Sequence, residues 1–143
     1  EIVSSFREIS NKKYIFTFNQ DFNNKKITKS IEIVYGLRNF IGNANKFSKS
    51  LIYINLKSDD EITEITIEDD GNGYSRDVLS KIGEPYLKAN NPQDKSKTGL
   101  GLGLFIGKTL LEKNFAYINC ENSKSKSGAK VTVRWKNKDL FNI

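Results

Sequence analysis

The sequence predicts a fold of the α+β class, a two-layer α/β sandwich around one hydrophobic core. The length of 143 residues fits a single domain. Short segments of alternating apolar residues occur in pairs joined by polar turns, as in hairpins. Segments with apolar residues at helical spacing are separate from these pairs and do not follow every strand. A regularly alternating parallel fold is therefore not expected.

The first strand is expected at residues 14–19, where apolar and polar residues alternate. A turn rich in Asp, Asn and Lys follows at residues 21–26. A helix is predicted for residues 29–49, because apolar residues return every three or four positions and form one stripe. The members of this stripe are Ile31, Val34, Leu37, Ile41, Ala44 and Phe47.

Residues 51–57 and 64–69 are predicted to be two strands of a hairpin, separated by an acidic turn. A short helix is expected at residues 76–82. The polar, lysine-rich segment that continues to Thr98 has no apolar periodicity, so it is predicted to be a mobile loop.

A second long helix is expected at residues 101–112. Strands are predicted at residues 115–120 and 129–135, and the Lys/Ser-rich turn 123–128 joins them. Cys120 and Trp135 lie in these strands, where we expect them to pack in the core.

The composition excludes several classes of function. The formal net charge is +6, but lysines are interleaved with Asp and Glu, which favours a solvated surface over a nucleic-acid interface. The chain has no histidine, so it has no His-based metal site or base, and the single Cys120 suits a reducing compartment. The chain also has no methionine, so we expect it to be a piece of a longer protein.

The first helix carries a polar ridge beside its apolar stripe. Asn39, Asn43 and Lys46 stand at positions i, i+4 and i+7 and therefore share one face. An asparagine oxygen is a neutral ligand suited to Mg²⁺, and a lysine can approach phosphates. A solvated helix face would have the same pattern, so this segment alone decides nothing.

A glycine turn follows the second hairpin strand. Asp70 precedes Gly71 and Gly73, which permit positive φ and a close approach of the backbone to a flat ring. A carboxylate there can accept a hydrogen bond from the adenine amino group, whereas guanine presents a carbonyl oxygen at that place. The alternative is an ordinary Asn-Gly turn with acidic neighbours.

Three glycines open the second long helix, at positions 99, 101 and 103. Backbone N–H groups at a helix N-terminus suit a phosphate. Two related motifs fail here. A P-loop ending at Thr109 would need glycine at position 102, where leucine stands, and the dinucleotide fingerprint would need a small residue in place of Ile106.

The three motifs, in this order, resemble the catalytic ATP-binding domain of sensor histidine kinases, within the ATPase superfamily shared with gyrase, Hsp90 and MutL. The resemblance covers residues 27–136. Residues 83–86, 99–112 and 128–135 are similar to the RegB/PrrB/ActS redox-responsive group. This resemblance implies the Bergerat fold, with helices packed on one face of a mixed β-sheet, and an ATP lid between Tyr86 and Thr98.

The resemblance also implies roles for individual residues. Asn39, Asn43 and Lys46 would form the catalytic set, with Asn43 as the Mg²⁺ ligand. The contacts with ATP would come from Asn43, Lys46, Phe47, Asp70, Gly71, Gly73, Lys88, Thr98, Gly99, Leu100, Gly101, Leu102 and Gly103. Asn39 stands where the ATP-hydrolysing relatives have a water-activating glutamate, so phosphotransfer is favoured over hydrolysis.

The implied function is that of a protein-histidine kinase in a two-component system. Residues 14–143 would form the ATP-binding domain, and residues 1–13 would connect it to a histidine-bearing dimerisation domain outside this chain. The phosphoryl group would pass to that histidine and then to a response regulator. The full protein is expected to be anchored in the inner membrane with this domain in the cytoplasm. A protein-serine kinase resembling anti-sigma factors, and a nucleotide-binding module without transfer activity, remain alternatives.

Overall fold

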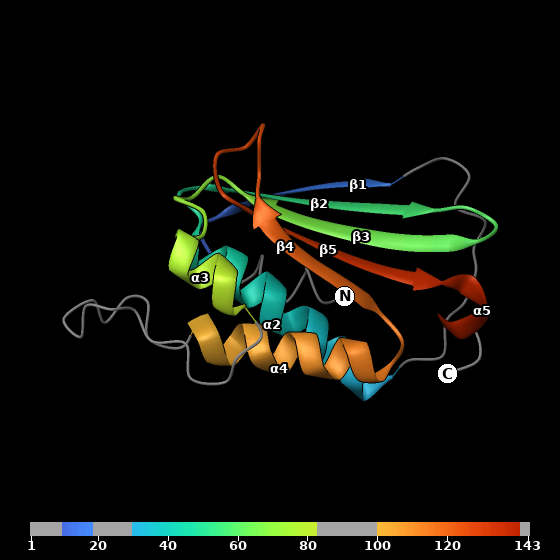
Figure 1. Ribbon diagram of the computed structural model, residues 1–143. Helices are drawn as coiled ribbons and strands as arrows, with labels where there is room; N and C mark the ends of the chain where they lie inside the picture. The colour runs from blue at the N-terminus through green and yellow to red at the C-terminus, as the bar shows by residue number, and fades with distance from the viewer. Residues whose placement is uncertain (1–9, 19–29, 83–99, 141–143) are drawn as a thin grey trace.

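A five-stranded mixed sheet forms one layer of the molecule (Figure 1). The computed structural model describes residues 10–18, 30–82 and 100–140. The sheet order is β1-β2-β3-β5-β4, where β1 and β2 are parallel and every other neighbouring pair is antiparallel. The strands are β1 (Lys13–Phe18), β2 (Leu51–Ser58), β3 (Ile62–Asp69), β4 (Tyr117–Asn122) and β5 (Ala129–Lys136).

The helices form the second layer, on one side of the sheet (Figure 1). The long helices α2 (Ile31–Phe47) and α4 (Leu100–Lys113) pack side by side, while the short helices are α3 (Arg76–Lys81) and α5 (Asn137–Leu140). None of the helices in the described part of the chain is long and apolar enough to cross a membrane. The predicted two-layer fold with helices on one face of a mixed sheet is confirmed.

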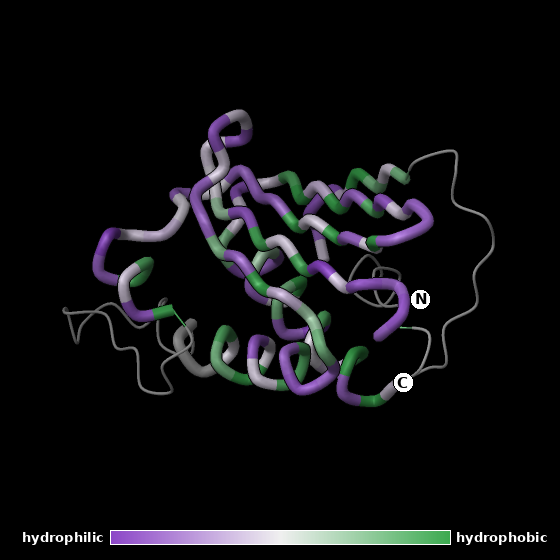
Figure 2. Tube along the Cα trace, turned by 45° about the vertical axis from the view of Figure 1, so that its right-hand side comes forward, coloured by the Kyte–Doolittle hydropathy of each residue, from purple (hydrophilic) through white to green (hydrophobic). Residues whose placement is uncertain are grey.

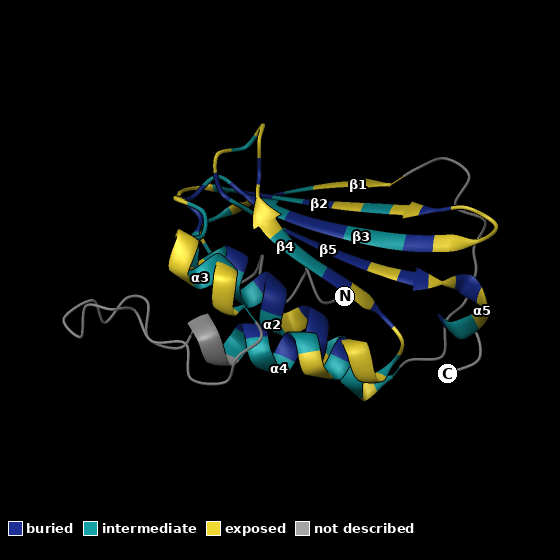
Figure 3. Ribbon diagram, in the orientation of Figure 1, coloured by how far each residue is buried: buried dark blue, intermediate teal, exposed yellow. Residues whose placement is uncertain are grey.

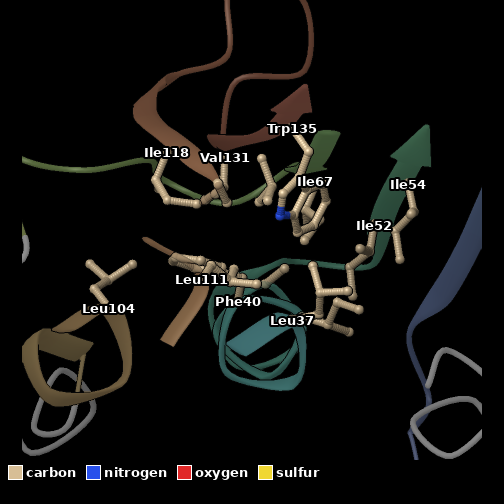
Figure 4. Packing of buried hydrophobic residues seen from close by; sticks show 14 of the residues in the cluster. Leu37, Phe40, Ile52, Ile54, Ile67, Leu104, Leu111, Ile118, Val131 and Trp135 are labelled. Carbon is tan, nitrogen blue, oxygen red and sulfur yellow. The ribbon is translucent and has the colours of Figure 1, made fainter. Parts of the chain in front are cut away.

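Strand alternation places the apolar side chains on the helix side. Hydrophobic and hydrophilic residues alternate along the strands (Figure 2), and the dark-blue buried segments run through the central strands and α2 (Figure 3). Phe40, Ile52, Ile67, Leu111 and Trp135 meet between the layers (Figure 4). Burying side chains of this size supplies most of the stability of such a domain. The predicted core position of Trp135 is thus confirmed.

Helix α2 begins after Ser30, whose Oγ accepts a hydrogen bond from the N–H of Ile33 at 3.4 Å. The helix was predicted correctly, and Leu37, Ile41 and Ala44 of its predicted stripe are buried, but two other positions differ from the prediction. Ile31, assigned to the apolar stripe, is 71% exposed, whereas Phe40, left out of it, is only 1% exposed. The reason is that α2 packs against α4 as well as the sheet, so it buries a wider face than one stripe.

The two long helices approach each other closely. A Cβ added at Gly36 of α2 would lie 2.6 Å from Cγ of Leu111 on α4. Only a residue without a side chain therefore permits this helix contact. The close packing brings the first turn of α4 beside the C-terminal half of α2.

The remaining predicted elements are mostly confirmed. The strands of both predicted hairpins pair antiparallel, and α3 lies one residue inside its predicted range. Cys120 lies against the core, and burial raises its pKa to about 11, which fits a packing role. The predicted mobile loop falls largely in residues 83–99, outside the described residues.

Candidate functional site

The three motifs meet at one end of the sheet, where β3 ends and α2 ends beside it (Figure 1). A Cβ added at Gly71, after β3, would lie 2.2 Å from the carbonyl oxygen of Phe47 at the end of α2. A Cβ added at Gly103, in the first turns of α4, would lie 3.1 Å from Oδ1 of Asn43. Segments far apart in the sequence therefore form one continuous surface.

Some predicted nucleotide contacts cannot be placed on this surface. Lys88, Thr98 and Gly99 lie outside the described residues. Leu100, Gly101 and Leu102 are described only as helical backbone at the start of α4. The predicted glycine-rich helix start is thus present from Leu100 onward.

Asn43 has an unusual environment. Its Nδ2 is buried and has no hydrogen-bond partner within the described part of the chain. A buried donor without an acceptor costs about 1–3 kcal/mol, so proteins rarely keep one without a reason. A ligand that brought an oxygen atom to this place would remove the cost.

Asn39 and Lys46 lie on the same helix in more open surroundings. Nδ2 of Asn39 donates to the carbonyl oxygen of Tyr35, one turn back, at 2.8 Å. Lys46 is exposed, and its Nζ lies 5.3 Å from the ring centroid of Phe47. Asn43 lies beside the start of α4, where a Cβ added at Gly103 would contact its carboxamide.

The carboxylate of Asp70 caps the beginning of β2. It accepts hydrogen bonds from the N–H groups of Lys49 at 2.8 Å, Ser50 at 3.1 Å and Leu51 at 3.1 Å, and from Oγ of Ser50 at 3.1 Å. Burial raises the pKa of Asp70, but these hydrogen bonds outweigh it, so the pKa falls below its ordinary value. Both carboxylate oxygens are occupied by the protein itself.

Asp69, its neighbour, points the other way. It is only 4% exposed, and its Oδ1 accepts from the N–H groups of Gly71 at 2.8 Å and Ala129 at 3.3 Å. Burial raises the pKa of Asp69, and the two hydrogen bonds offset only part of the rise. Within the described residues these bonds all go to Oδ1, which leaves Oδ2 available.

The base contact was predicted for Asp70, and the two aspartates differ in how far their carboxylates are already hydrogen-bonded. The carboxylate of Asp70 serves the backbone of residues 49–51, whereas Asp69 keeps an oxygen for another group. The alternation of side chains along β3 could have indicated this difference from the sequence. Ile67 faces the helix layer, so Asp69, two residues on, must face it too.

The turn between β4 and β5 closes this end of the site. A Cβ added at Gly128 would lie 2.1 Å from both the carbonyl oxygen and Oδ1 of Asp69. Tyr74 is packed against the core, where burial and then the charges of Cys120 and Asp69 raise its pKa. Asp69 therefore lies among closely packed groups with little freedom to move.

The two ends of the surface support different chemistry. Asp69 and the glycine turn offer a hydrogen-bond acceptor, while Asn43 and α4 offer an amide N–H group without a partner among the described residues and a helix start. The described residues contain no group of three or more Cys, Asp or Glu that could hold a metal.

Comparison with known proteins identifies relatives with this arrangement. Residues 28–139 match the family described as histidine kinase-, DNA gyrase B- and HSP90-like ATPases. The sensor histidine kinase RegB of Cereibacter sphaeroides is 33% identical over 124 residues, which is 76% of this chain and 27% of RegB. The sensor histidine kinase CpxA of Escherichia coli is 30% identical over 87 residues, 61% of this chain and 19% of CpxA. The chain thus spans about a quarter of the RegB length.

Solved structures share the fold. The mycobacterial sensor histidine kinase MprB superposes with a TM-score of 0.74 at 18% identity, covering 94% of this chain and 90% of that chain. The catalytic domain of the histidine kinase ThkA gives 0.70 at 18% identity, with 94% and 86% coverage. Full-length ShkA in complex with AMPPNP gives 0.68 at 19% identity, with 94% and 29% coverage.

Proposed function

Because the chain belongs to the family of histidine kinase-, DNA gyrase B- and HSP90-like ATPases, we propose that it is the ATP-binding catalytic domain of a sensor histidine kinase. One observation in the structure supports this most directly. Within the described residues, a buried carboxylate with a spare oxygen, Asp69, and a buried amide with a spare donor, Asn43, lie on segments that approach one another closely. These are the two groups that the base and the phosphates of ATP require.

Asp69 would bind adenine in place of the predicted Asp70. Its Oδ2 can accept a hydrogen bond from the adenine amino group while Oδ1 stays bound to Gly71 and Ala129. Guanine presents a carbonyl oxygen at the same place, and two facing acceptors would both be left unsatisfied. The site would therefore select ATP over GTP.

Asn43 would serve the phosphate end. Its Nδ2 can donate to a phosphate oxygen, and its Oδ1 is a suitable Mg²⁺ ligand together with phosphate oxygens and water. When bound, Mg²⁺ neutralises charge on the phosphates. Lys46 would add a positive charge from the next turn of α2, and the N–H groups of residues 100–103 would face the phosphates at the start of α4.

The residues of the site favour transfer to an acceptor over hydrolysis. Asn39 is a neutral amide already bonded to the backbone of its own helix, so it cannot activate water as a carboxylate would. The chain has no histidine, and the acceptor imidazole must then come from a dimerisation domain outside it. The contribution of these residues to the transfer is to position ATP and offset its charge.

The similarity to sensor kinases extends the proposal to the whole protein. Residues 1–13 would connect this domain to the histidine-bearing segment, and a response regulator would receive the phosphoryl group. The full protein would be membrane-anchored like a sensor, with this domain on the cytoplasmic side. No nucleic-acid partner is proposed.

Calorimetric titration of the domain with Mg·ATP and Mg·GTP tests the site. We expect ATP to bind more tightly than GTP. Asp69→Asn should keep the hydrogen bonds to Oδ1 but place an amide N–H where the acceptor was, which lowers affinity for ATP and narrows the difference from GTP. Asp70→Asn is the matched control, and it should retain ATP selectivity. Loss of selectivity in the control alone would assign the base contact to Asp70.

Radiolabelled ATP tests the transfer. The chain joined to its own upstream segment should become labelled on histidine. The phosphohistidine bond is recognised because it is stable to alkali and labile to acid. Label on serine would point to a serine kinase of the same fold, and tight ATP binding without any label would point to a module that has lost transfer activity.

A further inference from the structure

The segment between β3 and α3 lacks regular secondary structure, although the proposed base site depends on it. Residues 70–75 form no strand or helix. Asp69 precedes this segment and binds its Gly71 N–H. A segment without backbone pairing needs other contacts to hold one conformation.

One side chain on a distant strand supplies such contacts. Asn122, the last residue of β4, accepts a hydrogen bond at Oδ1 from the N–H of Tyr74 at 2.6 Å. Its Nδ2 donates to the carbonyl oxygen of Tyr74 at 2.9 Å. A single carboxamide thus satisfies both backbone groups of one residue, as a neighbouring strand would.

The backbone at Gly73, beside this contact, adopts a conformation that lets it approach the Asn122 side chain closely. Gly73 has a φ of +74°, a conformation that residues with side chains rarely adopt. A Cβ added at Gly73 would lie 2.6 Å from Oδ1 of Asn122. The turn therefore passes directly over the amide, with no room for a side chain between them.

Holding Tyr74 also constrains Asp69. Gly128 lies between the turn and Asp69: a Cβ added at Gly73 would lie 3.5 Å from the carbonyl oxygen of Gly128, and a Cβ added at Gly128 would lie 2.1 Å from Oδ1 of Asp69. Gly71 is bonded to Asp69 on one side, and Asn122 holds Tyr74 on the other. Residues 71–74 are therefore fixed at both ends.

We propose that Asn122 is a positioning residue of the nucleotide site: its bidentate contact with the Tyr74 backbone holds the glycine turn in the conformation that receives adenine beside Asp69. This inference rests on the proposed ATP site. Asn122 itself is exposed, and its side chain is bonded to the Tyr74 backbone, so it would act through the turn. It was absent from the residues predicted from the sequence.

Titration of Asn122→Ala and Asn119→Ala with Mg·ATP and with magnesium tripolyphosphate tests this inference. Asn119 lies on the same strand, and its side chain forms no hydrogen bond within the described residues. We expect Asn122→Ala to weaken ATP binding about tenfold and tripolyphosphate binding hardly at all, because two hydrogen bonds to the base-side turn are lost. Asn119→Ala should match the unmodified domain with both ligands.

Equal ATP affinity in Asn122→Ala and the unmodified domain would overturn the inference and leave the proposed function standing. An equal loss with ATP and tripolyphosphate would also overturn it, because it would show a general structural effect. Failure of the unmodified domain to bind ATP would instead overturn the proposed function, and the inference with it. If Asn122→Ala did not fold, Asn122→Asp keeps the acceptor for the Tyr74 N–H and should show a loss of about threefold with ATP only.

Discussion

The two ends of the site differ in how far the protein satisfies its own polar groups. At the base end, Asp69, Asp70 and Asn122 are all hydrogen-bonded to backbone. At the phosphate end, Nδ2 of Asn43 is buried and has no partner among the described residues. The base end is therefore held together by the protein's own hydrogen bonds, whereas the phosphate end keeps a donor that the proposed ligand would satisfy.

Substitutions at the two ends should therefore differ in their effects on the stability of the domain and on its affinity for ATP. Changes that remove hydrogen bonds or close packing at the base end should destabilise the domain as well as weaken binding, because these contacts support the fold. Changes at the phosphate end should weaken binding without destabilising the domain. Variants at each end test whether effects on stability and effects on ATP affinity can be distinguished.

The largest expected effect is at the base end. Gly128→Ala would place a methyl group 2.1 Å from two oxygen atoms of Asp69, so the β4–β5 turn would have to move. We expect a loss of about 3 kcal/mol in the free energy of unfolding, measured by urea denaturation. Ser125→Ala, an exposed change in the same turn, is the control and should cost little. An unchanged free energy of unfolding in Gly128→Ala would contradict the close packing of Gly128 against Asp69 at the base end.

Two asparagines of α2 test the comparison within one helix. Asn43→Ala should weaken Mg·ATP binding tenfold or more, at about 1.4 kcal/mol per tenfold, and leave stability unchanged or slightly higher. Oδ1 of Asn45 accepts hydrogen bonds from Oγ of Ser10 at 2.7 Å and the hydroxyl of Tyr14 at 2.8 Å. Asn45→Ala should therefore lose about 1–2 kcal/mol of stability.

Titration and thermal melts of the Asn43→Ala and Asn45→Ala variants distinguish the two cases. Destabilisation by Asn43→Ala equal to that by Asn45→Ala would show that Asn43 supports the fold, and the distinction between the two ends would fail.

The adjacent aspartates should give opposite pH dependences of stability. The pKa of Asp70 is lowered in the fold, so its contribution is present above the unfolded pKa and disappears as pH falls through the folded value. The pKa of Asp69 is raised, so stability falls as pH rises from the unfolded pKa through the folded one. Asp70→Asn should lower stability near neutral pH, and Asp69→Asn should raise it.

Denaturation curves of both aspartate variants between pH 3 and pH 7 measure these effects. If the two substitutions changed the pH profile in the same direction, the opposite environments of Asp69 and Asp70 would be refuted.

The smallest expected effect lies away from both ends. Phe115 follows α4 with a φ of 69° and is 66% exposed. Its N–H donates to the carbonyl oxygen of Glu112, and the N–H of Ala116 donates to that of Leu111, each at 3.0 Å. Glycine is the favoured residue at this position of a helix end, so Phe115→Gly should stabilise the domain by up to about 1 kcal/mol.

ATP affinity in Phe115→Gly should be unchanged, which makes it a reference for stability changes that do not reach the site. A weaker affinity in this variant would mean that the two ends are coupled to the rest of the fold more widely than the contacts indicate.

Much of the fold and part of the site were predictable from the sequence. The predicted family resemblance, including similarity to RegB, is confirmed by the match over residues 28–139 and the 33% identity. The strands and long helices were correct because apolar periodicity is a local property. The burial of Phe40 and the exposure of Ile31 did not follow from the predicted stripe, since both depend on where α4 packs.

The sequence by itself determined the elements, the order of the three motifs and the family. The tertiary structure decided which aspartate is available to a ligand and which asparagine holds the glycine turn. Asp69 meets Ala129, 60 positions away, and Asn122 meets Tyr74, 48 positions away. Hydrophobic periodicity and turn chemistry act over a few residues, whereas these hydrogen bonds join segments that only the assembled sheet brings together.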